Sequence, residues 1–159
     1  MPAVTKHHLP ILLHVLERNR ALLARIADGV EPAAARTALV PDGSHLQWML
    51  GHLVVSRDGL LAAVGGKRAW SEERAAPYDF GSVAGDTPDE PVSDLLATLA
   101  MQQERLAAAF ASLDDDVLAR PLGRSTVGET LEFGTWHESY HVGQATLYRR
   151  GVGLPSAIG

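Results

Sequence analysis

The sequence predicts an all-α protein with four long helices in a single domain, residues 1–159. Alanine and leucine are abundant and aromatic residues make up only 6% of the chain, a composition that favours helix. Two stretches, residues 9–26 and 95–110, place leucines and other apolar residues at the spacing of one helix face, and two further stretches begin at capping-box patterns. A length of 159 residues suits one domain whose core needs no disulfide or structural metal to fold.

The first two helices are separated by a linker that contains proline and glycine. The first is expected over residues 5–28, because leucines and one isoleucine follow the helical period there and Gly29 is a typical stop. Ser44 followed by Gln47 matches a capping box, in which each residue bonds the other's backbone. We therefore expect the second helix to begin there and to run to about Val64.

The next connection, residues 65–90, is rich in glycine, proline and charge and is long for a compact domain. Its length lets the third helix run parallel to the second. A short helix is expected near residues 71–76. We expect Trp70, Tyr78 and Phe80 to pin this connection to the rest of the protein; the alternative is that they line the mouth of a pocket.

The third and fourth helices follow in turn. The third is expected over residues 91–113. Three consecutive aspartates at 114–116 point in different directions, so a solvated loop or a helix cap is expected there rather than a cation site. Thr126 with Glu129 forms a second capping box, which predicts the start of a helix that runs to about Arg150.

The expected fourth helix carries the strongest chemical motif. His137 and His141 are four residues apart, so both imidazoles lie on one face, one turn apart, and can bind one divalent metal ion. Glu138 completes the pattern H-E-x-x-H, which in metalloproteases supplies two zinc ligands and a general base. The alternative for Glu138 is a salt bridge or an interhelical hydrogen bond. Gln144 falls on the histidine face.

A third ligand must come from earlier in the chain. A protein zinc site needs at least three ligands, and residues 142–159 contain no histidine, aspartate or glutamate. This absence weighs against an ordinary H-E-x-x-H peptidase. His52, in the middle of the second helix among apolar neighbours, is the preferred ligand; the alternative is a core histidine that bonds a neighbour. His45 competes with it, and His14 is a weaker candidate.

Composition excludes other classes of function. The formal net charge is −5 and no basic run is present, so no nucleic-acid partner is expected. The absence of cysteine excludes thiolate ligands and a cysteine nucleophile. Residues 1–10 lack the apolar segment of a signal peptide, and no apolar run is long enough to span a membrane. A cytoplasmic protein without membrane contact is therefore expected.

Two stretches resemble the DinB/YfiT family of metal-dependent bacterial proteins. One is W-M-L-G-H-L-V at 48–54; the other runs from G-E-T-L at 128–131 through H-E-S-Y-H-V-G-Q at 137–144 and ends in R-R-G at 149–151 and L-P at 154–155. The order of helices and the long second connection are also similar. The resemblance implies a four-helix bundle with a crossover between helices two and three. It also implies a metal site built from His52, His137 and His141.

The ligand set and the resemblance together indicate a function. Three neutral imidazoles leave a bound ion its charge and an open face; Zn²⁺ is expected, with Ni, Fe and Co as alternatives. Characterised relatives include transferases and isomerases that use low-molecular-weight thiols such as bacillithiol or mycothiol. The resemblance thus implies a thiol-dependent S-transferase or a related hydrolase acting on a small molecule, with Glu138 and Gln144 as candidate catalytic residues. A non-catalytic metal-binding stress or interaction protein, a peptidase and a homodimer are left open.

Overall fold

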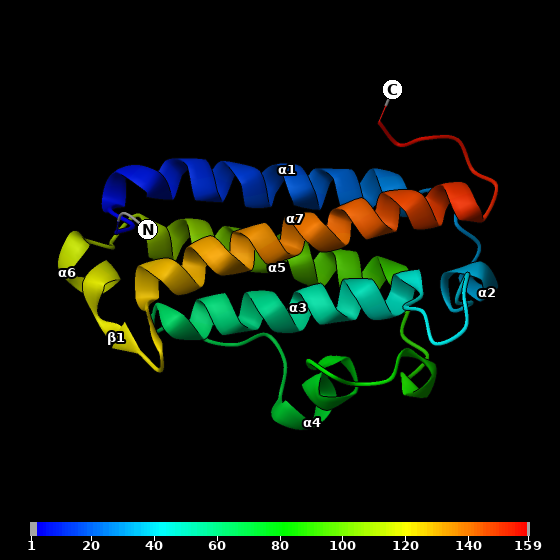
Figure 1. The fold of residues 1–159 in the computed structure, drawn as a ribbon, viewed down its shortest axis with the longest axis horizontal. Helices are drawn as coiled ribbons and strands as arrows, with labels where there is room; N and C mark the ends of the chain where they lie inside the picture. The colour runs from blue at the N-terminus through cyan, green and yellow to red at the C-terminus, as the bar shows by residue number, and fades with distance from the viewer. Residues whose placement is uncertain (1–2, 159) are drawn as a thin grey trace.

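The computed structural model describes residues 3–158, and four long helices lie side by side along one axis within this range (Figure 1). They are α1 (Leu9–Ala27), α3 (Leu46–Ala63), α5 (Val92–Phe110) and α7 (Val127–Gly151). Shorter elements are η1 (Lys6–His8), α2 (Pro32–Ala35), α4 (Glu72–Ala75), η2 (Ala76–Tyr78), η3 (Ala84–Asp86), α6 (Asp115–Ala119) and the two-stranded hairpin of β1 (Pro121–Leu122) and β2 (Ser125–Thr126). Among residues 3–158, no helix combines the length and the apolar character that a membrane crossing needs.

The four long helices form two pairs. The two helices of each pair are parallel, and the two pairs run in opposite directions. Figure 1 shows α3 and α5 beginning at the end of the bundle near α2, whereas α1 and α7 begin at the opposite end. The long connection between α3 and α5 lies outside the bundle along α3 and returns the chain to its starting end (Figure 1). The expected parallel arrangement of the second and third long helices is therefore confirmed, as is the all-α bundle.

The core fills the axis of the bundle in two clusters of leucine-rich contacts. One cluster occupies the half nearer α2 and joins α1, α3, α5 and α7 to the crossover. The other occupies the half nearer α6 and joins the same four helices to α6. Leucine is the commonest buried residue of both clusters, with Leu16, Leu23, Leu50, Leu99 and Leu131 among them.

The residue that caps the N-terminus of α3 differs from the prediction. His45, and not Ser44, occupies the N-cap, and its Nδ1 accepts a hydrogen bond from the backbone N–H of Trp48 at 3.1 Å. The side chain of Gln47 instead donates to a backbone carbonyl of the crossover at 2.6 Å. The predicted Ser44–Gln47 capping box is therefore wrong, because a tertiary contact engages the glutamine.

The cap of α7 matches the prediction. Thr126 Oγ1 accepts from the backbone N–H of Glu129 at 3.2 Å, and the Glu129 carboxylate accepts from the backbone N–H of Thr126 at 2.8 Å. In the aspartate run, Asp114 accepts from the backbone N–H of Val117 at 2.9 Å and opens α6, so the cap interpretation is confirmed. The helix α6 itself was not predicted, and α5 ends at Phe110 rather than at residue 113.

Buried polar bonds hold the crossover against α3. The Asp58 carboxylate is almost fully buried and accepts hydrogen bonds from the backbone N–H groups of Ala69 at 2.6 Å and Trp70 at 3.0 Å. It also accepts from the side-chain amide of Gln102 on α5 at 2.8 Å. One carboxylate of α3 thus fixes the first part of the crossover and ties it to α5.

Aromatic side chains fix the later part of the crossover. Trp70 and Tyr78 are buried, as expected of residues that pin the connection. The Tyr78 ring lies so close to Gly51 that a Cβ at this glycine would be 2.2 Å from a ring carbon. Phe80 is 88% exposed, so the expectation that it pins the loop is wrong and the alternative, a residue at the mouth of a pocket, is correct.

Candidate metal centre

Three histidines from two helices meet on one side of the bundle. His52 projects from α3, and His137 and His141 project from successive turns of α7. The Nε2 atom of His137 lies 3.3 Å from that of His52 and 3.1 Å from that of His141. Within residues 3–158 these three form a group whose ligand nitrogens all lie within 4.8 Å of one another.

The two helices approach closely at this point because glycine faces leucine. A Cβ at Gly134 of α7 would be 2.4 Å from the side chain of Leu60 on α3. Gly134 is one turn before His137, so the close approach lies directly beside the histidines. Antiparallel packing then sets a mid-helix residue of α3 opposite the i, i+4 pair of α7.

Hydrogen bonds on the outer side of the rings orient two of the imidazoles. His52 Nδ1 lies 2.8 Å from the carbonyl oxygen of Tyr78, an acceptor, so Nδ1 carries the proton and Nε2 keeps its lone pair. Ser56 Oγ is 3.4 Å from His137 Nδ1. The Trp48 ring stacks on His52 with a centroid distance of 4.7 Å. This backbone-bonded, packed arrangement is typical of metal-binding histidines.

Burial keeps the three imidazoles neutral. It lowers the pKa of His52 and of His137, and it lowers the pKa of His141 to about 4, with the neighbouring His52 and His137 adding to the effect. At neutral pH all three rings therefore carry free lone pairs. The Nδ1 atom of His141 is buried and finds no hydrogen-bond partner among the described residues.

The donor set fits a divalent cation. His52 Nε2 points a lone pair at His137 Nε2, and such a meeting of unprotonated nitrogens is repulsive unless a proton or a cation lies between them. In a tetrahedral zinc site with metal–nitrogen distances of about 2.0–2.1 Å, neighbouring ligand nitrogens are about 3.3–3.4 Å apart. The observed separations of 3.1 and 3.3 Å are close to that value. His52, His137 and His141 could therefore hold one ion, each through Nε2.

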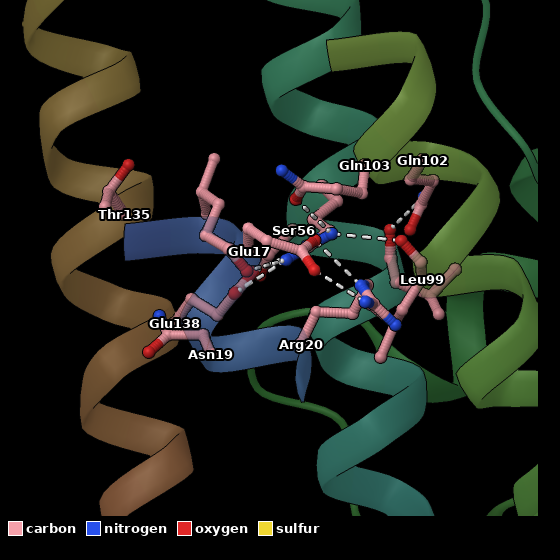
Figure 2. Close-up of polar contacts among 12 residues, drawn as sticks. Glu17, Asn19, Arg20, Ser56, Leu99, Gln102, Gln103, Thr135 and Glu138 are labelled. Atoms are coloured by element: carbon pink, nitrogen blue, oxygen red, sulfur yellow. Dashed lines mark hydrogen bonds and ion pairs between the residues drawn. The ribbon is translucent and has the colours of Figure 1, made fainter. Parts of the chain in front are cut away.

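Glu138 lies on α7 between these ligands but faces the interior of the bundle. Its side chain is 1% exposed, and both carboxylate oxygens accept from the fully buried guanidinium of Arg57, at 2.7 and 2.9 Å. Arg57 also donates to the carbonyl of Leu16, the carbonyl of Leu99 and the side chain of Gln103. Figure 2 shows this region, with Leu99 and Gln103 on α5 and Glu138 on α7. The geometry matches the salt bridge that stood as the alternative to a catalytic base.

The other candidate residues lie at the edge of the group or outside it. Gln144 is half-buried one turn after His141, and its amide donates to the hydroxyl of Tyr140 at 3.1 Å. His45 caps α3 and its Nε2 is 2.8 Å from a crossover carbonyl, so it does not join the ligand group. His14 is exposed on α1.

Two hollows open beside the histidines and share His52 and His137 in their walls. The larger has a volume of about 550 Å³ and reaches His141, while the smaller, of about 290 Å³, extends towards Leu60. Large aromatic side chains stand around the larger hollow and are mostly exposed: Phe80, Phe133, Trp136 and Tyr140. We name these four residues the aromatic rim.

Two parts of this site escaped the sequence analysis. The aromatic rim left a signal in the spacing of Phe133, Trp136 and Tyr140, which repeats every three or four residues on one side of α7. Arg57 left a signal as one of two adjacent charges, with Asp58, within the otherwise apolar second helix. Neither pattern predicts its partner, because the partners lie on other elements.

Comparison with known families agrees with the geometry. A sequence profile of the DinB superfamily matches residues 15–145, which is most of the chain and includes all three histidines of the candidate centre. A search of curated proteins gave no significant match. The profile confirms the resemblance expected from the sequence motifs, and the chain belongs to the DinB superfamily.

Proposed function

We propose that this protein holds one divalent metal ion through His52, His137 and His141 and catalyses a thiol-dependent transfer reaction on a small molecule. The observation that carries the proposal is the meeting of three neutral imidazoles beside an open hollow, in a ligand group without carboxylate or thiolate. Zinc is the expected ion, with nickel, iron and cobalt as alternatives, because imidazole suits all four.

Some residues of the chain would hold the metal ion, and the hollow beside them leaves room for a thiol cosubstrate. A divalent ion held by three neutral ligands supplies a Lewis acid that favours the thiolate form of a thiol. The Tyr78 carbonyl and the Trp48 ring keep His52 in the orientation that such an ion requires. The chain contains no cysteine, so the thiol of a transferase comes from a cosubstrate that enters through the hollow.

The engagement of Glu138 supports this proposal over a peptidase. A general base must lie within hydrogen-bond reach of the water it activates, at about 2.6–3.2 Å or through one further water. Both oxygens of the Glu138 carboxylate are bound by Arg57 inside the bundle. The open hollow supports a reaction over a non-catalytic metal-binding role, which needs no space for a substrate beside the ion.

A cobalt-substituted protein tests the proposal. The protein is loaded with Co²⁺ and titrated with mycothiol, bacillithiol and mercaptoethanol, and the absorption spectrum is recorded. We expect a sulfur-to-cobalt charge-transfer band that Glu138→Gln leaves largely intact. In His52→Ala the band should be absent. An unchanged spectrum at saturation with all three thiols would contradict thiol binding and favour a hydrolase or a non-catalytic metal-binding protein.

A further inference from the structure

The aromatic rim is unusual because large apolar rings stand in solvent beside a polar site. The exposed fractions are 88% for Phe80, 61% for Phe133 and Trp136, and 53% for Tyr140. Phe80 comes from the crossover and the other three from α7, so two elements supply one apolar surface. Exposed apolar groups that gather around a hollow commonly mark a binding site.

The rings of the rim continue into the ligand group without a break. Phe133 lies nearly parallel to the imidazole of His137, with centroids 5.9 Å apart and planes 18° apart. Trp136 and Tyr140 are 6.1 Å apart and inclined by 23°. A flat group that lies on these faces is therefore also beside the metal ligands. Offset contacts between aromatic faces at such distances favour planar, conjugated partners.

The side chains around the hollows provide no positively charged partner for an anionic group on the rim. Among the described residues, the side chains that line both hollows include no lysine and no arginine. Asp79 is the one carboxylate among them, and it accepts from the backbone N–H of Phe80 at 2.7 Å. Proteins that recognise carboxylate or phosphate groups commonly present arginine, lysine or clustered backbone N–H groups. A cationic group is disfavoured as well, since a divalent ion would lie a few atoms away.

We propose that the aromatic rim binds an uncharged, flat, conjugated part of the acceptor substrate and so selects neutral aromatic compounds over anionic ones. This inference rests on the proposed function only in treating the rim's ligand as the substrate that meets the metal. The volume of about 550 Å³ suits a small molecule, for which pockets of about 300–1,000 Å³ are usual. A second copy of the chain is the competing occupant.

Binding of a neutral probe to the metal-free protein tests the rim apart from any reaction. The chain has three tryptophans, of which Trp136 is exposed and Trp48 and Trp70 are buried, so their indole N–H signals report on different places. ¹⁵N-labelled protein is titrated with naphthol and, separately, with naphthalene sulfonate. We expect naphthol to shift the Trp136 signal and to leave the Trp70 signal in place, with an affinity at least about tenfold above that of the sulfonate.

Two matched variants locate the site. Phe133→Ala is expected to weaken naphthol binding about fivefold to tenfold, since one stacking face is lost. Leu147→Ala removes a similarly exposed apolar side chain of α7 that lies outside both hollows, and it should leave the affinity unchanged. Equal binding of naphthol and the sulfonate, or equal effects of the two variants, would overturn the proposal.

Sedimentation tests whether a second copy of the chain covers the aromatic rim. If a second copy covers the rim, the Trp136 signal will depend on protein concentration, Phe133→Ala will dissociate a dimer, and naphthol will not bind; this result also overturns the proposal. We expect the sedimentation coefficient to be the same for the unchanged protein and for Phe133→Ala. The cobalt–thiol band tests the proposed function independently, because it requires neither naphthol nor the rim.

Discussion

His52 joins two parts of the site that lie far apart in the sequence. It is the ligand candidate from α3, and its Nδ1 is bound by the Tyr78 carbonyl of the crossover. His137 and His141 share a helix and would keep their relative positions without it. Two imidazoles alone hold a divalent ion weakly in a site that requires at least three protein ligands. The third histidine therefore decides whether the α7 pair becomes a metal site.

We expect His52→Ala to lower zinc affinity by more than about 100-fold, which exceeds the usual cost of losing an outer hydrogen bond to a metal ligand. Competition with a chromophoric chelator measures the affinity, and elemental analysis after dialysis gives the stoichiometry. His14→Ala is the matched control, because His14 is exposed on α1 and outside the ligand group. One tightly held ion per chain in His52→Ala would mean that the third ligand is another residue.

The crossover positions His52 by packing against α3. Asp58 bonds the start of the crossover, and Tyr78 packs on Gly51, the residue directly before the histidine. Glycine suits this position because a Cβ would lie 2.2–2.7 Å from atoms of the tyrosine ring, which is steric overlap. The contact that admits the ring also sets the Tyr78 carbonyl against the imidazole, so the packing of one element determines the orientation of a ligand on another.

Gly51→Ala and Gly59→Ala form a matched pair on α3. The first adds a methyl group 2.2 Å from a carbon of a fully buried ring, and overpacking of this kind costs about 1–3 kcal/mol. It should also weaken zinc binding about tenfold, since the Tyr78 carbonyl is displaced. The second meets nothing within 4 Å and should stabilise the helix by about 0.4–1 kcal/mol. Urea unfolding measures both, and equal stabilities would contradict the packing of the crossover on α3.

Local patterns predicted the long helices of the molecule, and tertiary contacts account for what they missed. The leucine period, the Thr126–Glu129 capping box and the stop at Gly29 depend on residues close in sequence, and the structure has all three features. The cap of α3 moved because the crossover engages Gln47. Phe80 was placed wrongly because an isolated aromatic residue in a loop carries no periodic signal.

The candidate metal ligands were predictable from local spacing and a family motif, whereas the contacts around them depend on tertiary packing and were not. The i, i+4 pair of α7 is visible in any helical reading of the sequence, and the family motif indicated His52. The structure brings the three together, while their role as metal ligands stays a prediction. The Arg57 partner of Glu138 was missed because it depends on which faces of α3 and α7 meet inside the bundle.

The bundle should keep its fold when the metal is removed. Its two apolar clusters run the length of the long helices and contain none of the three histidines. Chelation is expected to leave the far-ultraviolet circular dichroism unchanged. It should lower the free energy of unfolding only by the binding term, about 4 kcal/mol at a free zinc concentration 1,000 times the dissociation constant. Loss of the helical spectrum on chelation would show instead that the ion is part of the core.

The last prediction concerns the ion pair that joins all four long helices. Arg57 of α3 bonds Glu138 of α7, the Leu16 carbonyl of α1, and both the Leu99 carbonyl and the Gln103 side chain of α5. Glu138→Gln leaves the buried guanidinium without its counter-charge, and breaking such a pair costs about 3–5 kcal/mol. We therefore expect a large loss of stability in urea unfolding, with zinc affinity in the folded protein nearly unchanged.

A double variant separates this structural role from a catalytic one. Replacing both partners, as in Arg57→Met with Glu138→Met, removes both buried charges together, and well-packed apolar substitutes for a buried pair are often neutral or stabilising. The double variant should therefore recover most of the stability that Glu138→Gln loses, and it should keep the cobalt–thiol band. If Glu138 acted as a base in the reaction, the double variant would be just as stable but would lose turnover of any identified substrate along with the carboxylate.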